Sequence, residues 1–130
     1  MRALVAGIAL LISALGANAA PLPTNVDVPR KVAASGVPLV LWQVSSVAPD
    51  CSSVGNATFR MLSGPSHGNV IIRPAKVFSR AQSACTGRRV AGEQAVYSSR
   101  PNYVGPEAVD FEVIFPNGEA QRVHIPITVM

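Results

Sequence analysis

Residues 109–129, VDFEVIFPNGEAQRVHIPITV, decide the fold that this sequence predicts. Apolar side chains occupy every second position on both sides of the Asn117-Gly118 pair. They are Val109, Phe111, Val113 and Phe115 before the pair, and Val123, Ile125, Ile127 and Val129 after it. A period of two places alternate side chains on opposite faces of a β-strand, one facing a core and the other facing water. Asn and Gly both tolerate the positive φ angles of tight turns, so the stretch predicts a β-hairpin with one buried face.

Two residues depart from this alternation. Ile114 interrupts the polar face of the first strand, and Pro126 has no backbone N–H to donate. Within a sheet, proline is confined to edge strands, strand starts and bulges. We therefore expect the final strand to be an edge strand near Pro126, or to carry a β-bulge there.

Other parts of the chain predict further short strands. Residues 37–47, 57–62, 69–73 and 93–98 are strand-like and lie between turn-forming Gly, Pro, Asn and Ser clusters. Residues 73–92 are basic and irregular, and we expect a long loop there with a strand only around Val77 and Phe78. No stretch after the N-terminal segment shows a sustained helical period. The sequence thus predicts an all-β fold, an antiparallel β-sandwich of about seven strands.

The N-terminal segment has the features of a cleaved signal peptide. Arg2 precedes an apolar run of 12 residues from Leu4 to Leu15, and a small-x-small motif follows at 17–19. The run is shorter than the roughly 20 residues that a membrane-spanning helix needs. The alternative is a buried N-terminal helix. The expected organisation is a signal peptide at 1–19, an extended leader at 20–30 and one domain at 31–130, without a transmembrane segment in the exported chain.

The two cysteines, Cys51 and Cys85, both lie in the part predicted to be exported. In an oxidising compartment, two cysteines in one small domain are expected to pair. The alternative is a reactive thiol, which requires a neighbouring base or a CxxC spacing, and the sequence has neither. We therefore predict a structural disulfide between them.

Residues 97–111, YSSRPNYVGPEAVDF, place two tyrosines, two prolines and a glycine just before the alternating strands. Together with residues 65–70, PSHGNV, they resemble the bacterial Ig-like and cadherin-like domains that occur as repeats in large surface proteins. The matching positions are Pro65, His67, Gly68 and Val70 in the first piece, and Tyr97, Pro101, Tyr103 and Gly105 in the second. The resemblance covers about residues 58–129 and implies an Ig-like β-sandwich.

The sequence departs from the family pattern at several positions of the second piece. They are Ser99 for proline, Asn102 for glycine, Glu107 for aspartate, Val109 for phenylalanine and Phe111 for tyrosine. Asn is a mild replacement, because it readily adopts positive φ. These departures leave open a different sandwich family with similar turns.

Tyr97 and Tyr103 bracket the proline turn that also contains Pro101, and Gly105 follows it. We expect this structural corner to cover one end of the core with the two rings. Buried tyrosines usually find a partner for the hydroxyl group, and Ig-like sandwiches use a tyrosine in this way. We therefore expect both hydroxyls to bond to backbone carbonyls.

Catalytic and metal-binding patterns are sparse. The chain has two histidines, His67 in the predicted turn and His124 on the predicted solvent face, whereas a zinc or copper site normally needs three or four clustered ligands. No nucleophile elbow, phosphate-binding loop or paired carboxylate motif is present. We expect neither cofactor nor metal, and a non-enzymatic protein. The alternative, a small hydrolase or metalloenzyme, requires His67 and His124 to converge with acidic groups.

Positive charge gathers between residues 73 and 100. The basic residues of this stretch are Arg73, Lys76, Arg80, Arg88, Arg89 and Arg100. Such a patch can bind an acidic glycan or the phosphates of lipopolysaccharide, with Arg80, Arg88 and Arg89 as the candidate binding residues. The alternative is a solvated loop that keeps the protein soluble. The aromatic residues expected between the charges of a nucleic-acid surface are missing.

These features together predict an exported, non-enzymatic binding or structural module of the cell envelope, periplasmic or secreted. Its expected partner is an envelope protein or a glycan, and not nucleic acid. Binding of a polyanion through the basic residues is the second hypothesis.

Overall fold

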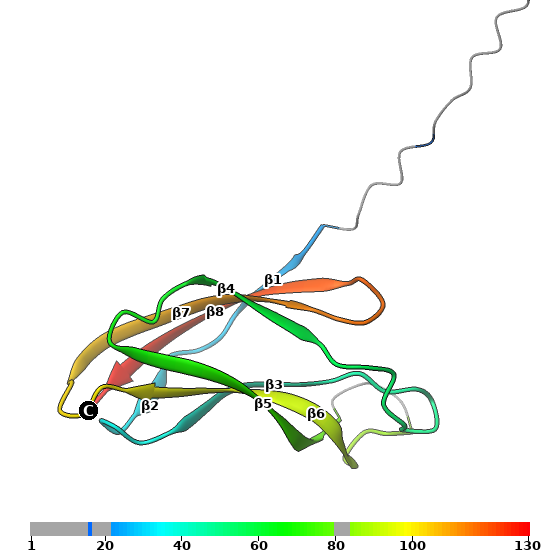
Figure 1. Cartoon of the computed structure of the whole chain (residues 1–130), viewed down its shortest axis with the longest axis horizontal. Helices are drawn as coiled ribbons and strands as arrows, with labels where there is room; N and C mark the ends of the chain where they lie inside the picture. Colours follow the sequence, from blue (N-terminus) through cyan, green and yellow to red (C-terminus); the bar gives the residue numbers. More distant parts are fainter. Residues whose placement is uncertain (1–15, 17–21, 80–83) are drawn as a thin grey trace, which may run out of the picture.

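The computed structural model describes residue 16, residues 22–79 and residues 84–130. In these parts of the chain it contains eight β-strands and no helix (Figure 1). The strands are β1 (Thr24–Asp27), β2 (Lys31–Ala33), β3 (Leu39–Ser45), β4 (Thr58–Ser63), β5 (Gly68–Phe78), β6 (Arg89–Ser99), β7 (Gly105–Ile114) and β8 (Ala120–Val129). The predicted all-β class is confirmed.

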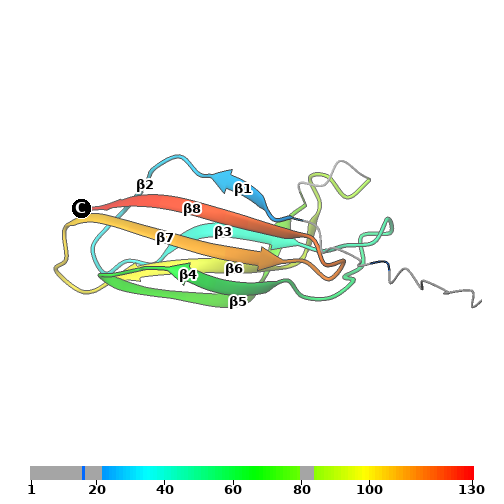
Figure 2. The same cartoon turned by 90° about the horizontal axis from the view of Figure 1, so that it is seen from above.

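The strands form two sheets that face each other as a sandwich (Figure 2). One sheet has the order β1-β8-β7-β4, with β2 also paired to β8, and the other has the order β3-β6-β5. The strand number is eight instead of about seven, because β1 and β2 occupy successive parts of the same edge of β8. Both run parallel to β8, so this sheet is mixed and not wholly antiparallel as predicted.

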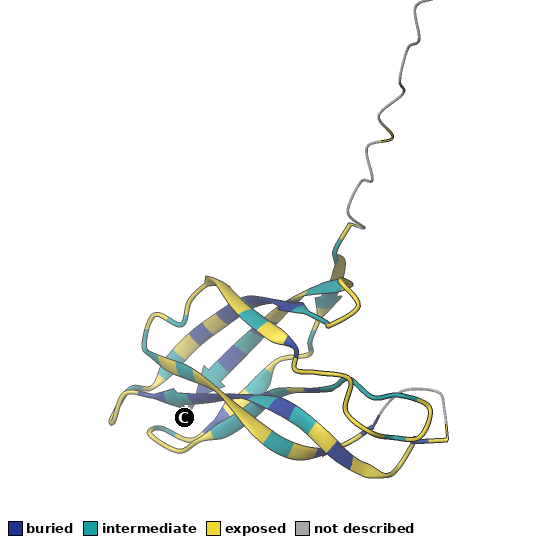
Figure 3. Ribbon diagram, turned by 45° about the vertical axis from the view of Figure 1, so that its right-hand side comes forward, coloured by how far each residue is buried: buried dark blue, intermediate teal, exposed yellow. Residues whose placement is uncertain are grey.

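The core lies between the sheets and is built mainly by the β7–β8 hairpin (Figure 3). In the hairpin register Val109 pairs with Ile125 and Phe111 with Val123, and all four side chains are at most 1% exposed. The predicted apolar face is therefore buried, and the intervening residues point outward. Phe115 is the exception, because β7 ends at Ile114 and leaves its ring only partly buried.

The turn of this hairpin is longer than the Asn-Gly pair predicts. The N–H of Phe115 donates to the carbonyl of Glu119 at 2.8 Å, so three residues form the loop. Gly118 has a φ of 87°, whereas Asn117 is not in the left-handed region. The Asn117 side chain instead accepts the N–H of Glu119 at 3.0 Å. In three-residue loops only the last residue needs positive φ, which explains the difference.

Pro126 does not mark an edge strand, contrary to the prediction. β8 lies inside its sheet, between β7 on one side and β1 and β2 on the other. However, β1 pairs with β8 only as far as His124, and β2 pairs only from Ile127 onward. Pro126 falls in the gap between the two pairings. Its missing N–H is thus accommodated where no neighbouring strand needs it.

The predicted long loop at 73–92 is wrong. β5 continues without interruption from Gly68 to Phe78, and all eleven residues pair with β6. Pro74 lies inside this strand, but β5 is an edge strand, so its missing N–H faces away from the ladder. The connection between β5 and β6 is therefore limited to residues 79–88.

We expect Phe111→Ala to lower the free energy of unfolding by about 3–5 kcal/mol, because it removes a fully buried ring from the centre of the core. Phe78→Ala is the matched control, since the Phe78 side chain is 65% exposed and leaves no internal cavity. Urea unfolding of the oxidised proteins measures both. Equal losses for the two variants would contradict the assigned core.

Candidate functional site

The predicted corner closes one end of the sandwich between β6 and β7. The N–H of Tyr103 donates to the carbonyl of Arg100 at 3.2 Å, and Asn102 has a φ of 67°. The Tyr103 hydroxyl donates to the backbone carbonyl of Pro106, as predicted. Gly105 has a φ of 143°, and a Cβ there would lie 3.0 Å from the Tyr103 hydroxyl. Pro101 lies exposed at the tip of the turn.

The Tyr97 hydroxyl does not bond to a backbone carbonyl, contrary to the prediction. Tyr97 is fully buried, and its hydroxyl donates to Oε2 of Glu107 at 3.1 Å. Burial and the negative charge of Glu107 raise the pKa of the Tyr97 phenol above its ordinary value. The phenol therefore stays protonated and serves as a donor.

Glu107 is a structural residue that the sequence reasoning missed. Its carboxylate accepts the N–H groups of Ser66 at 2.9 Å, His67 at 2.7 Å and Ala108 at 3.2 Å, besides the Tyr97 hydroxyl. Burial opposes the charged form, but these four donors outweigh it and lower the pKa of the carboxyl. The sequence contained an indication of this role, because Glu107 lies two residues before Val109 and so belongs to the inward-facing positions of β7. The interaction ties the β4–β5 turn to the corner.

We expect Glu107→Gln to destabilise the fold by about 2 kcal/mol or more at neutral pH, because either amide orientation sets an NH2 group against backbone donors. The pKa of Glu107 is lowered in the folded state, so its stabilising contribution is present above the ordinary value of 4.5 and is lost as the pH falls through the folded value. The difference between the variant and the parent should therefore shrink in acid. Unfolding curves from neutral pH to pH ~3 test this, and a difference independent of pH would contradict it.

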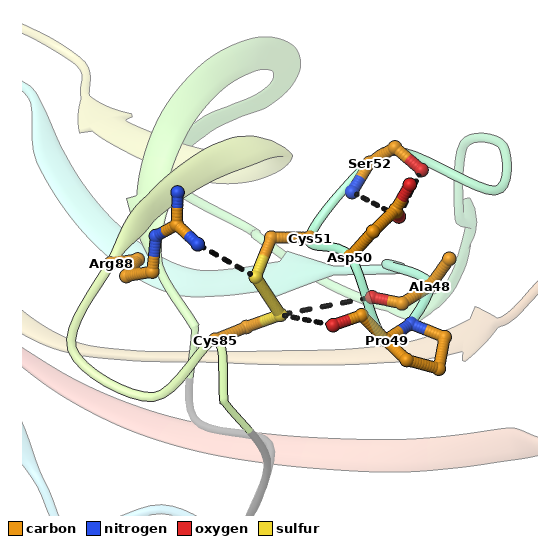
Figure 4. Close-up of a disulfide and its surroundings, with 7 residues drawn as sticks. All are labelled: Ala48, Pro49, Asp50, Cys51, Ser52, Cys85 and Arg88. Atoms are coloured by element: carbon orange, nitrogen blue, oxygen red, sulfur yellow. Dashed lines mark hydrogen bonds between the residues drawn. A yellow bond between two sulfur atoms is a disulfide. The ribbon is translucent and has the colours of Figure 1, made fainter.

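The opposite end of the sandwich carries the predicted disulfide (Figure 4). Cys51 and Cys85 are bonded, with their Cα atoms 5.5 Å apart. The bond joins the β3–β4 connection to the β5–β6 connection. Cys85 is fully buried, and Nη1 of Arg88 donates to the sulfur of Cys51 at 3.4 Å.

The described basic residues of the predicted set are spread along the β5–β6 pair, with Arg73 and Lys76 on β5. Arg80 lies outside the described residues. Arg88 and Arg89 are exposed near the disulfide, with the Arg89 guanidinium 5.9 Å from the ring centroid of Phe78. Arg100 follows the other end of β6, an eleven-residue strand about 35 Å long. Of the described candidate binding residues, Arg88 contacts the disulfide and Arg89 is its neighbour in the chain.

A cleft of about 560 Å³ lies at the disulfide end of the sandwich. The ribbons of the two layers diverge toward this end (Figure 1). One wall is β3 with the residues that follow it, and the other is the loop of the β7–β8 hairpin. The lining residues are Trp42, Gln43, Val44, Ser45, Ser46, Val47, Val54, Phe78, Phe115, Pro116, Asn117, Glu119 and Gln121. Clefts of this size with a few polar groups are typical small-molecule sites, which makes this the candidate functional site.

Three aromatic rings border the cleft and come from three different elements. They are Trp42 of β3, Phe78 at the end of β5, and Phe115 after β7. The sequence analysis did not select them. The sequence could have indicated two of them, because Phe78 and Phe115 lie at the ends of predicted strands. Neighbouring strands bury a side chain less completely there.

A smaller cleft of about 330 Å³ continues along the same strand. It lies between β3 and the β1–β2 segment, and it shares Trp42 and Gln43 with the larger cleft. Among the described strands, β3 pairs only with β6, so its other edge borders both clefts. The two clefts together follow β3 from Val40 to Ser45 and the next two residues to Val47.

A buried carboxylate lies on the inner face of β6, beside the cleft wall. Glu93 is 7% exposed and is in register with Val44, which lines the cleft. One carboxylate oxygen accepts the N–H of Ala57 at 3.2 Å, and the other has no partner among the described residues. Burial raises the pKa of this carboxyl above its ordinary value, and the single hydrogen bond offsets this only in part.

Glu93→Gln is expected to raise the melting temperature at neutral pH, because Gln keeps an acceptor for Ala57 without burying a charge. The pKa of Glu93 is raised in the folded state, so stability is lost as the pH rises above the ordinary value of 4.5 and through the folded value. The advantage of the variant should vanish near pH ~4, where the folded carboxyl is protonated. Melting curves measure this, and a variant less stable than the parent at neutral pH would refute it.

The two histidines serve separate structural contacts. The His67 ring stacks on Tyr103 with ring centroids 4.1 Å apart, at the corner. His124 lies on the outer face of β8, with Nδ1 2.6 Å from a carboxylate oxygen of Asp110. Within the described residues, no group of three or more His, Cys, Asp or Glu side chains is placed to hold a metal ion.

The described parts of the chain include no helix that is long and apolar enough to cross a membrane.

Comparison with known proteins yields one distant structural similarity. No family model and no curated protein matches the chain. The crystal structure of a 2,6-sialyltransferase from a Photobacterium species, solved with CMP and lactose, aligns with a TM-score of 0.35 and 10% sequence identity. The alignment covers 83% of this chain but only 18% of that structure. At this TM-score the similarity carries no argument about fold or function.

Proposed function

We propose that the protein is an exported, non-enzymatic binding module of the cell envelope that acts through the cleft beside the disulfide. The observation that carries the proposal is the cleft itself, with three aromatic rings and several polar side chains around about 560 Å³. A ring that is 65% exposed, as Phe78 is, contributes little to folding. Such a ring at the mouth of a cleft is better explained by ligand contact.

Export is supported by the disulfide, because such bonds persist in oxidising compartments outside the cytosol. The predicted signal peptide, residues 1–19, lies outside the described residues except for Gly16. The periplasm and the medium both satisfy this requirement.

Binding is favoured over catalysis by the roles of the acidic and histidine side chains. Glu107 is occupied by four donors at the corner, and Glu112 is paired with Arg60 at 3.0 Å and Arg122 at 3.1 Å. His124 faces outward on β8, whereas His67 lies at the corner. The convergence of both histidines with acidic groups, which a hydrolase or metalloenzyme would require, has no support in this arrangement.

Kinship with Ig-like and cadherin-like domains is part of the proposal. If β1 and β2 count as the first strand A and the remaining strands as B to G, the sheets become A-G-F-C and B-E-D. Ig sandwiches divide strands B to G in the same way. The tyrosine in the connection before β7 supports the kinship as well.

Polyanion binding is the second candidate, and the position of Arg89 favours it. The Arg89 guanidinium lies over Phe78, which lines the cleft, and Arg88 is adjacent. An acidic glycan or a phosphate group at the cleft mouth would meet both charges.

Retention of the purified protein on isolated envelopes of the producing cells tests the proposed function. We expect Phe78→Ala to weaken retention about tenfold, because one contact ring is lost. Ile71→Ala is the matched control, since Ile71 is 51% exposed on the same strand and does not line the cleft. Cosedimentation at increasing protein concentration gives the affinities.

Equal retention of parent, Phe78→Ala and Ile71→Ala would refute the cleft as the binding site. The double variant Arg88→Ala/Arg89→Ala addresses the second candidate. If polyanion binding dominates, this variant loses retention and the parent loses it steeply with rising salt. If the uncharged cleft dominates, both changes have little effect.

A further inference from the structure

We infer that the cleft beside the disulfide is a saccharide site, which takes an uncharged oligosaccharide along β3. This rests on the proposed function and names the ligand class of the same site.

Three aromatic residues supply apolar surface, and of these the Phe78 side chain is exposed whereas Trp42 and Phe115 are partly buried against the core. Trp42, Phe78 and Phe115 are three of the seven aromatic residues of the chain, and all three border the cleft. A pyranose ring presents an apolar face of C–H groups and a rim of hydroxyls. The C–H groups pack against aromatic faces, which carry partial negative charge. A ligand with alternating apolar faces and polar rims therefore matches this arrangement.

Amide and hydroxyl side chains supply the polar contacts. Gln43, Asn117 and Gln121 line the cleft, together with Ser45 and Ser46. Each amide offers both an acceptor oxygen and an NH2 donor, and each serine hydroxyl can donate and accept. Sugar hydroxyls likewise donate and accept, so the two sets complement each other. The amide oxygens of Gln43 and Asn117 already accept hydrogen bonds within the protein, at 3.4 Å and 3.0 Å. A purely aliphatic ligand would leave the remaining donors and acceptors without partners, at a cost in affinity.

The charges of the lining side chains indicate whether the ligand is a neutral saccharide or an anion. Glu119 is the one charged side chain among the residues that line the larger cleft. Sites for carboxylates and phosphates use Arg or Lys side chains, and no Arg or Lys of the described part of the chain lines the larger cleft. Arg89 reaches the site only through its contact with Phe78 at the mouth. The interior therefore favours an uncharged ligand.

The shape of the site favours more than one sugar unit. The smaller cleft of about 330 Å³ continues from Trp42 and Gln43 toward β1 and β2, and its lining includes one residue of each charge, Asp27 and Lys31. An extended peptide added to the free edge of β3 is the competing occupant. However, the β3–β6 register shifts between Val40 and Trp42, and such a bulge interrupts the regular edge that strand addition needs. The side-chain lining and the edge geometry both favour the saccharide.

Trp42 makes a direct measurement possible, because it is the one tryptophan of the chain. We would titrate the oxidised protein with cellohexaose, maltohexaose and chitohexaose, and with polygalacturonate as the anionic probe, while following tryptophan fluorescence. A saturable change with a neutral hexasaccharide is expected. Phe78→Ala should weaken it about tenfold and Ile71→Ala should not. Binding of polygalacturonate alone would overturn the uncharged ligand.

Treatment of the isolated envelopes separates failure of the inference from failure of the proposed function. Periodate cleaves the vicinal diols of sugars, whereas proteinase K removes protein receptors. Phe78-dependent retention that is lost after periodate supports the saccharide. Retention that survives periodate and is lost after proteinase K overturns it in favour of a peptide ligand, while the binding function of the cleft stands. Failure of the protein to be retained, with no response to the hexasaccharides, overturns both proposals.

Discussion

The register between β7 and β8 is the constraint on which the rest of the sandwich depends. Val109 pairs with Ile125 and Phe111 with Val123, and every inward side chain of these pairs is buried. A shift of one residue would turn all of them toward water and the charged residues toward the core. The three-residue turn closed by Gly118 fixes this register, and β1, β2 and β4 then add to the two outer edges of the hairpin.

Glu107 extends this constraint to the facing sheet. It belongs to β7, yet its carboxylate accepts the hydroxyl of Tyr97 on β6 and the N–H groups of the β4–β5 turn. A buried carboxylate is costly unless its hydrogen bonds are complete, and here four donors complete them. The corner therefore closes one end of the sandwich with a specific polar network as well as with aromatic rings.

Local sequence patterns predicted what depends on neighbouring residues in the chain. The period of two identified β7 and β8, and the pairing of Cys51 with Cys85 followed from their number and from the prediction of export. Features that depend on strand order were missed. A proline within a strand pattern predicts an edge strand. The gap between the β1 and β2 pairings, which accommodates Pro126 inside the sheet, exists only once the sheet has assembled. The cleft escaped prediction for the same reason, since its lining comes from segments distant in sequence.

The two ends of the sandwich are stabilised by different means, and this difference explains where a binding site can form. At the corner, Tyr97 and Tyr103 fill the space between the sheets. At the other end, a covalent bond between Cys51 and Cys85 stabilises the loops, in the chain-entropy model by about 4 kcal/mol for a loop of this length. An end held by a disulfide does not need a closely filled interior. The Phe78 side chain at this end is 65% exposed and remains accessible to a ligand, whereas Trp42 and Phe115 also pack in part against the core.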